Sequence, residues 1–278
     1  MTGLPPPPND SPAADALDHA AALQRREAPA FARAALAEGR VELVLHPIHD
    51  ARDLARIAFH EARPRLRDAG GRVIPPSDLA AARAETDLGA AIDCATLGLA
   101  LAALGGRENL RLLLPLSPAT LCSFEWRMTL EAGLRLDPSL ADRLILGVDA
   151  TAFAALPVVV SAFLDPLRGR GASLALCGFG AAPFTPRPFA TQDFDFIQLD
   201  PRVVQGLADD ARRRNIVAML LSLARHSEAF VIASGVERAE DAAWLGAAGI
   251  DGIQGPAIPR PGADTTTIAE PPLRHRGT

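Results

Sequence analysis

His46, His60 and Glu61 are side chains of the types that bind metal ions or transfer protons. Each lies in an apolar segment typical of a β-strand. Because adjacent strand residues point to opposite faces, His60 should face away from Glu61, so at most His46 and Glu61 converge. Two protein ligands are too few for a metal site. We therefore expect no metal ion at these residues.

Cys177 ends another apolar segment and has the type of a nucleophile, but no histidine stands near it in a motif. We favour a buried, unreactive thiol. Cys94, Cys122 and Cys177 show no CxxC spacing, which argues against a disulfide framework or zinc site and fits a reducing cytoplasm. No compact set of acid, base and nucleophile follows the expected strands, so we expect no catalytic residue.

The elements that position these side chains alternate along the chain. Short β-like segments are expected at residues 41–48, 54–61, 110–116, 143–149, 172–177, 194–199, 230–233 and 250–254. Amphipathic helical stretches are expected at residues 77–104, 151–168, 201–227 and 237–248. This alternation predicts a parallel sheet, and about eight units favour a closed α/β barrel. Only residues 49–53 separate the first two strands, so that pair should be antiparallel and the barrel irregular.

Composition limits the class of protein. The chain has 278 residues, of which 49% are hydrophobic and 22% charged, as in soluble globular proteins. Its formal net charge of −5 argues against general nucleic-acid binding. We recognise no signal peptide, and apolar runs such as Leu97–Leu104 are too short to cross a bilayer, so we expect no membrane span and a cytoplasmic protein. The expected organisation is a Pro- and Ala-rich segment, disordered or marginally helical (1–28), one barrel domain (29–261) and a flexible tail (262–278).

Eight motifs near the expected strand ends carry a resemblance. They are His46-Pro47-Ile48, Glu61–Arg65, Leu114–Ser117, Leu146–Ala150, Cys177–Gly180, Phe196–Asp200, Ala233–Glu237, and Gln254-Gly255 with Arg260-Pro261. In this order they resemble the motifs QPI, EALLR, VNLS, LEITE, DDFG, YLKID, AEGVE and QGY…RP of the EAL domain of bacterial cyclic-di-GMP phosphodiesterases. The resemblance covers almost the whole body of the chain. It implies an irregular (βα)8 TIM-like barrel of the EAL type, in one domain with flexible tails.

The family hydrolyses cyclic-di-GMP with two divalent cations, which need clustered oxygen ligands. By resemblance, the ligand positions are Glu61, Pro115, Gly147, Cys177, Gly178 and Ser234, of which only Glu61 has a carboxylate. Gln198 replaces the family's lysine, and three prolines stiffen the loop Ala181–Pro188 where the family has a flexible segment. Losing even one outer partner of a metal ligand costs about 10–100-fold in affinity or activity. The expectation is a degenerate member that is not an enzyme and holds no metal or cofactor.

Side chains that match family positions are candidate contacts of the dinucleotide, and they are Glu61, Arg65, His46, Gln254 and Glu237. Arg65 matches the signature's arginine, which lies near a phosphate in the family, and an ordinary surface or ion-paired arginine is the open alternative. For Glu61 we favour a carboxylate at the barrel mouth paired with an arginine such as Arg65. Glu237 should open a helix and favour its positive end, a structural role, while Gln254 stays open.

Three functions compete. We expect a non-catalytic regulatory module of cyclic-di-GMP signalling that binds a protein partner, because framework residues of the motifs persist while ligand positions do not. The alternative is a metal-independent cyclic-di-GMP receptor, which the surviving candidate contacts favour. The third, residual phosphodiesterase activity, conflicts with the ligand positions. The family often pairs through the region around Gly180, so a homodimer also stays open, and the sequence names neither partner nor pathway.

Overall fold

A computed structural model describes residues 26–181, 192–258 and 267–269 of the chain. Most of the expected N-terminal segment, nearly all of the Pro-rich loop and most of the expected tail lie outside the described residues. The first described element is a helix over residues 26–37. It runs across the boundary that the sequence suggested between residues 28 and 29.

The core of the molecule is a barrel of eight strands, β1 to β8, with a ninth strand added at one edge. The strands are β1 (Val41–Asp50), β2 (Asp53–Leu66), β3 (Leu112–Pro115), β4 (Leu144–Asp149), β5 (Ser173–Phe179), β6 (Phe196–Leu199), β7 (Phe230–Ala233), β8 (Gly252–Ile253) and β9 (Thr267–Ala269). Strands β2 to β8 run parallel to their neighbours, and β1 lies antiparallel to both β2 and β8, which closes the barrel. The predicted irregular barrel with an antiparallel first strand is confirmed.

The outer edge of β1 is shared by two strands. Its last two residues, His49 and Asp50, pair with β8, while its segment Glu42–Val44 pairs with β9. Strand β9 belongs to the tail that we expected to be flexible, and for Thr267–Ala269 that expectation is wrong. The pairing has a physical reason, because β8 is too short to satisfy the backbone donors and acceptors along the whole of β1.

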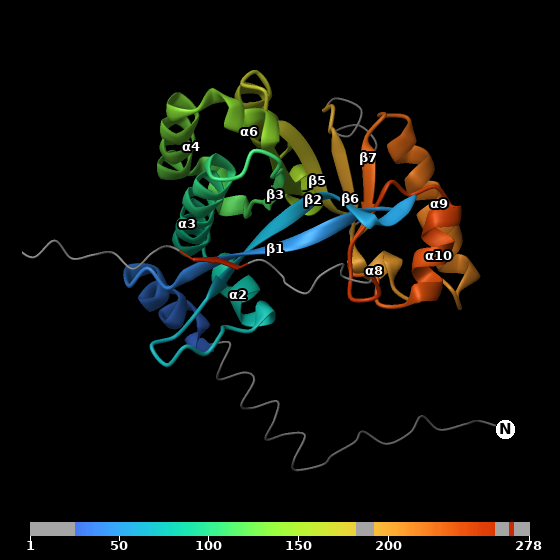
Figure 1. The fold of residues 1–278 in the computed structure, drawn as a ribbon, viewed down its shortest axis with the longest axis horizontal. Coiled ribbons are helices and arrows are strands. Elements are labelled where there is room, and N and C mark those ends of the chain that lie inside the picture. The colour runs from blue at the N-terminus through green and yellow to red at the C-terminus, as the bar shows by residue number, and fades with distance from the viewer. Residues whose placement is uncertain (1–25, 182–191, 259–266, 270–278) are drawn as a thin grey trace, which may run out of the picture.

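Helices cover the outside of the barrel. They are α2 (Pro76–Arg83), α3 (Thr86–Gly105), α4 (Phe124–Leu136), α5 (Ala150–Ala155), α6 (Pro157–Arg168), α8 (Pro201–Val204), α9 (Ala211–Arg225) and α10 (Ala239–Ala247), with 3-10 turns η1 (Pro118–Cys122) and η2 (Pro138–Arg143). Figure 1 shows α3, α4 and α6 on one side of the barrel and α9 and α10 on the other.

Three of the four expected helical stretches are divided into two helices. Between α5 and α6 the break falls at Leu156, which has φ −134°, because the following Pro157 disfavours a helical conformation there. Between α8 and α9 the chain turns through Gly206, whose φ of 74° suits a residue without a Cβ. Aspartates cap the starts of α5 and α8, where Asp149 and Asp200 accept backbone N–H groups of the first turn.

Helix α3 is the one helix in the described part of the chain that is long and apolar enough, by length and composition, to cross a membrane. The run Leu97–Leu104, which by itself is too short to cross a bilayer, lies inside this helix. In the structure α3 packs against α4, η1 and β1, and 56% of its 18-residue apolar window is buried. This is the environment of a core helix in a barrel.

Apolar side chains fill the inside of the barrel in one layer. They come from seven different strands and are Ile48, Phe59, Leu113, Ile145, Ala175, Phe196 and Ile232. Phe59 and Phe196 meet edge to face, with ring centroids 5.1 Å apart. A much larger apolar cluster joins the outer faces of the strands to the surrounding helices. The packed inner layer makes the barrel a solid support, so the open end above it is where side chains can meet a ligand.

Candidate functional site

One further level of side chains lies above the apolar layer, at the carboxyl ends of the strands. Because side chains two apart on a strand point to the same face, the next inward residues after the apolar layer are defined by the pleat. They are Glu61, Pro115, Gly147, Cys177, Gln198 and Ser234. These include five of the six positions that the resemblance marked as metal ligands. The fold therefore brings those positions together at one level of the barrel mouth.

Glu61 is buried and its carboxylate is held by Arg63. The Arg63 Nε donates to Glu61 Oε1 at 2.8 Å, and Arg63 Nη2 donates to Glu61 Oε2 at 2.9 Å. The Glu61 side chain is 2% exposed, whereas that of Arg63 is 53% exposed. The Glu61 carboxylate raises the pKa of the Arg63 guanidinium, mainly by direct charge attraction. A fork of two parallel hydrogen bonds is the strongest arrangement for this pair, and it engages both carboxylate oxygens.

Our sequence interpretation paired Glu61 with an arginine such as Arg65, and that choice of partner is wrong. Arg65 Nε lies 3.0 Å from Glu42 Oε2, and Arg65 also donates to the Thr267 hydroxyl of β9. Glu42 holds a second arginine, Arg67, at 2.7 Å. The reason lies in the register of the β1–β2 hairpin, which sets Glu42 directly opposite Arg65, whereas Arg63 lies opposite the apolar Val44 and pairs with Glu61 on its own strand.

Gly147 and Cys177 share one volume of space. A Cβ atom built on Gly147 would lie 2.7 Å from the Cys177 Sγ, closer than real atoms approach. The thiol thus fills the space that a side chain at position 147 would use. Burial raises the pKa of the Cys177 thiol strongly, with smaller contributions from the nearby Glu61 and Asp149 carboxylates. A protonated, buried thiol is unreactive, as the sequence led us to expect.

The remaining polar groups of this level are engaged with the protein. The buried Ser234 hydroxyl donates to the Leu199 carbonyl at 2.9 Å. Gln198 is buried and its Nε2 lies 3.5 Å from Glu61 Oε2, a long contact beside the stronger one from Arg63. In the described part of the chain, no group of three or more His, Cys, Asp and Glu side chains is arranged to hold a metal ion.

The other candidate contacts are placed around this level. His46 lies directly opposite Glu61 across the β1–β2 pair, and Gln254 Nε2 donates to the His46 carbonyl at 3.3 Å. Glu237 does not open a helix, because α10 begins two residues later and has other acids in its first turn. Its carboxylate instead accepts a hydrogen bond from Gln205 Nε2 at 2.8 Å, which ties the loop after β7 to the loop after α8.

Two cavities open at the mouth, on either side of Arg63. The larger is about 610 Å³, and its polar lining includes His46, Glu61, Arg63, Arg83 and Gln198. The smaller is about 290 Å³ and is lined at one end by His46 and Arg63 and at the other by the loops after β7 and β8. Of the candidate contacts, His46 lines both cavities, Glu61 and Arg65 line the larger, Gln254 lines the smaller, and Glu237 lines neither.

Sequence reasoning missed two arginines of the site. Arg63 stands where the family motif has its first leucine, so its position two residues after Glu61 on a strand was a signal that could have been used. Arg83, from α2, donates to the Pro115 carbonyl at 2.9 Å and to the buried Asp93 carboxylate at 2.5 Å. No strand-end motif contains Arg83 or Asp93, and only the packing of α2 and α3 reveals them.

Fold and motif positions together define a barrel of the EAL class. The family model described as "EAL domain" matches residues 30–261, and the chain therefore belongs to the EAL domain family.

Solved structures agree on the fold. The EAL domain of FimX from Pseudomonas aeruginosa bound to c-di-GMP superposes with a TM-score of 0.74 at 21% identity, covering 82% of this chain and 93% of that one. The Xanthomonas citri FimX EAL domain in complex with c-di-GMP gives 0.72 at 21% identity, over 85% and 94%. The PaMucR phosphodiesterase in a c-di-GMP complex gives 0.72 at 20% identity, over 82% and 94%. Among curated proteins, no sequence matches this chain.

Proposed function

We propose that this chain is a catalytically inactive EAL-type module that acts in the cytoplasm by binding another protein in cyclic-di-GMP signalling. The observation that carries the proposal is the ion pair of Glu61 with Arg63. Both oxygens of the only carboxylate among the six family ligand positions are taken by a guanidinium of the same strand. In the family this carboxylate binds a metal cation, whereas in this chain it binds the Arg63 guanidinium.

The other donors at this level do not fit a pair of Mg²⁺ ions. Magnesium requires near-octahedral coordination by oxygen atoms. Pro115 and Gly147 offer no side-chain donor, and Cys177 offers a protonated thiol that suits softer metals. Ser234 uses its hydroxyl on a backbone carbonyl. Without the metals no water would be activated, and the neutral Gln198 removes the positive charge that the family's lysine places near the water and phosphate.

A second candidate is a metal-independent receptor for cyclic-di-GMP. It is favoured by the 610 Å³ cavity, which lies within the usual range of about 300–1,000 Å³ for ligand sites and is lined by Arg63, Arg65 and Arg83. The FimX domains that share this fold were solved with c-di-GMP bound. Against it, each of these three arginines is paired with a carboxylate of the chain, namely Glu61, Glu42 or Asp93. A phosphate would have to share or displace these partners, so we rank the receptor second.

The deciding experiment is calorimetric titration of the purified protein with cyclic-di-GMP, with Mg²⁺ and with a chelator, followed by chromatography of the same samples. We expect neither heat nor linear dinucleotide. Binding at about micromolar Kd, near −8 kcal/mol, that persists in chelator without product would make the chain a receptor. Linear product in the Mg²⁺ samples alone would refute the proposal of inactivity.

A further inference from the structure

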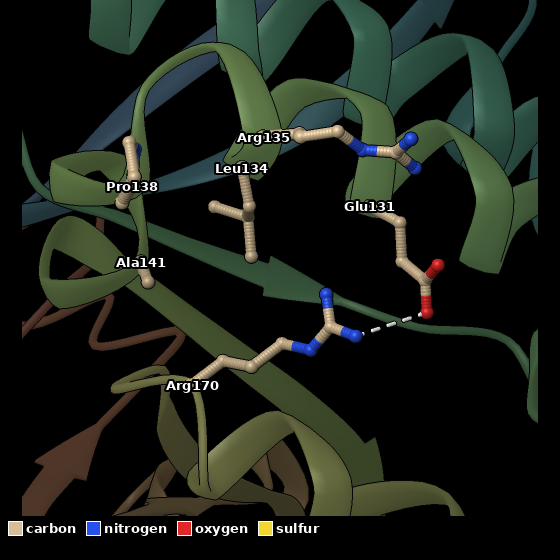
Figure 2. Close-up of a pocket in the computed structure, with 6 residues that line it drawn as sticks. All are labelled: Glu131, Leu134, Arg135, Pro138, Ala141 and Arg170. Atoms are coloured by element: carbon tan, nitrogen blue, oxygen red, sulfur yellow. Dashed lines mark hydrogen bonds and ion pairs between the residues drawn. The ribbon is translucent and has the colours of Figure 1, made fainter.

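The outer surface of the barrel carries a groove beside α4 and α6. It shares no lining residue with the two cavities at the barrel mouth. It consists of two adjoining hollows, of about 490 and 330 Å³, which both touch Glu131 and Arg170. We call these two hollows the α4–α6 groove. The 3.2 Å ion pair of Arg170 with Glu131 lies where the two hollows meet, and Figure 2 shows it reaching from the turn after α6 to α4.

The larger hollow is apolar at its base and at one rim. Leu121, Leu130 and Phe163 form part of its base and are buried. At the rim, Val158 is 80% exposed and Val159 is 38% exposed. Two further exposed apolar residues of α4, Phe124 and Met128, stand one helical turn apart, as side chains at i and i+4 do. Phe124 and Met128 line neither hollow, but with Val158 and Val159 they make α4 and α6 rich in exposed apolar side chains, as is typical of an interaction surface.

The polar rim of the groove is cationic. Arg127 lines the larger hollow, and Arg135 lines the smaller, where Figure 2 shows it extending beside Glu131. No ion pair involves either of them within the described residues, and both are exposed. The one carboxylate of the lining, Glu131, is already neutralised by Arg170. The groove therefore presents an apolar base with uncompensated positive charge along its edge.

We propose that this groove receives an amphipathic helix of a protein partner, with apolar side chains facing the base and carboxylates along its flank. The inference rests on the proposed function, because it names the kind of partner that the module would bind. An α-helix laid between two helices presents apolar anchors at positions i, i+3 or i+4 and i+7, which suits a channel between α4 and α6. Carboxylates on the flank would meet Arg127 and Arg135 and guide association.

Charge argues against a second copy of this chain as the occupant. In a two-fold symmetric contact the same patch meets itself, so the unpaired Arg127 and Arg135 of one copy would approach those of the other. Like charges brought together across an interface oppose association. An acidic helix meets no such cost.

The test uses two synthetic peptides of equal length with the same leucine stripe at i, i+3, i+4 and i+7. One carries glutamates on its flanks, and the other carries lysines. Binding is followed with an environment-sensitive dye on Cys122, an exposed thiol next to Leu121 of the groove, in a Cys94→Ser background. We expect the acidic peptide to bind about tenfold more tightly than the basic one, and the difference to shrink as salt increases.

Variants assign the binding to the groove. The change Val158→Asp should weaken both peptides at least tenfold, and Arg127→Glu with Arg135→Glu should reverse the preference between them. These positions are exposed, so the fold should persist. The matched control is Ile216→Asp, which alters an exposed apolar residue of α9 on the other side of the barrel and should leave both affinities unchanged.

Several results would overturn the inference. Absence of binding, equal affinity for both peptides, or the same loss in the Ile216→Asp control would each do so. A dimer in sedimentation that Val158→Asp abolishes would assign the groove to a second copy. Tighter peptide binding after removal of residues 1–25 would assign it to the chain's own N-terminal segment. Hydrolysis of cyclic-di-GMP would refute the proposed function alone, because the peptide assay does not depend on the barrel mouth.

Discussion

Replacing Arg63 by leucine is the most direct perturbation of the barrel mouth, because it returns the residue type of the family motif and removes the partner of Glu61. The Glu61 carboxylate is 2% exposed and receives two hydrogen bonds from Arg63. In the variant only the 3.5 Å contact with Gln198 would remain among these bonds. A buried carboxylate that loses its counter-ion is costly to the folded state.

The expected loss of stability depends on how deeply Glu61 and Arg63 are each buried. Removing one partner of a fully buried ion pair costs about 3–5 kcal/mol. Arg63 is half exposed, so solvent screens part of the interaction, and we expect a loss of about 2 kcal/mol in the free energy of unfolding. The matched control is Arg65→Leu on the same strand. Its partner Glu42 keeps Arg67 at 2.7 Å, so that change should cost less than about 1 kcal/mol.

The assay is urea unfolding of the wild type, Arg63→Leu, Glu61→Leu and the double variant, combined as a double-mutant cycle. The double variant should be more stable than Arg63→Leu alone, because an apolar pair replaces an unpaired charge. If Arg63→Leu costs no more than Arg65→Leu, or if the two changes at positions 61 and 63 are simply additive, Arg63 does not hold Glu61 and our account of the site is wrong.

Four further predictions concern glycines and cysteines of the chain. Gly147→Ala should destabilise by about 1–3 kcal/mol through overpacking against Cys177, and a cycle with Cys177→Ala should show coupling of about 1 kcal/mol in urea unfolding. Since burial raises the pKa of the Cys177 thiol, the unfolded state alone releases its proton above about pH 8.5, so stability should fall from there as pH rises, and less so in Cys177→Ala. In native protein a thiol reagent should modify Cys122 and spare Cys177 until denaturant is added; equal rates would contradict its burial. Gly255→Ala should fail to fold or lose more than about 4 kcal/mol in thermal unfolding, because its Cβ would lie 2.1 Å from the Val236 carbonyl oxygen; a near-native Tm would refute that.

The fold could be predicted from the sequence because apolar runs and their spacing are local signals. All eight strands of the barrel were expected, and the seventh, Phe230–Ala233, matches in both bounds. The antiparallel first pair followed from the short connection between its strands. Helix breaks were less predictable, since Pro157 and Gly206 interrupt amphipathic patterns that otherwise continue across them. Strand β9 was missed because its pairing depends on an edge left open by a two-residue neighbour, which no local pattern records.

The candidate site was predictable in position and less so in contacts. Motif order placed the inward residues at the strand ends, where the structure has them. Which arginine reaches Glu61 depends on hairpin register and on side-chain direction, and there Arg65 was chosen in place of Arg63. The interaction of Arg83 with Asp93 crosses two helices, so it could not be inferred from either segment alone. Such ion pairs depend on how side chains pack in the folded structure, which local sequence patterns do not record.

The short strand β9 also bears on the tendency of the barrel to aggregate. A barrel normally has no free edge, but here β8 pairs with only His49 and Asp50 of β1, and the edge at Glu42–Val44 is covered by β9. An uncovered edge is a template for strand addition from a neighbouring molecule, the first step of edge-to-edge aggregation. Residues 267–269 thus protect this edge of β1 from pairing with another molecule. Trimming the chain after residue 261, where the family match ends, would remove β9 and expose Glu42–Val44 of β1 to self-association.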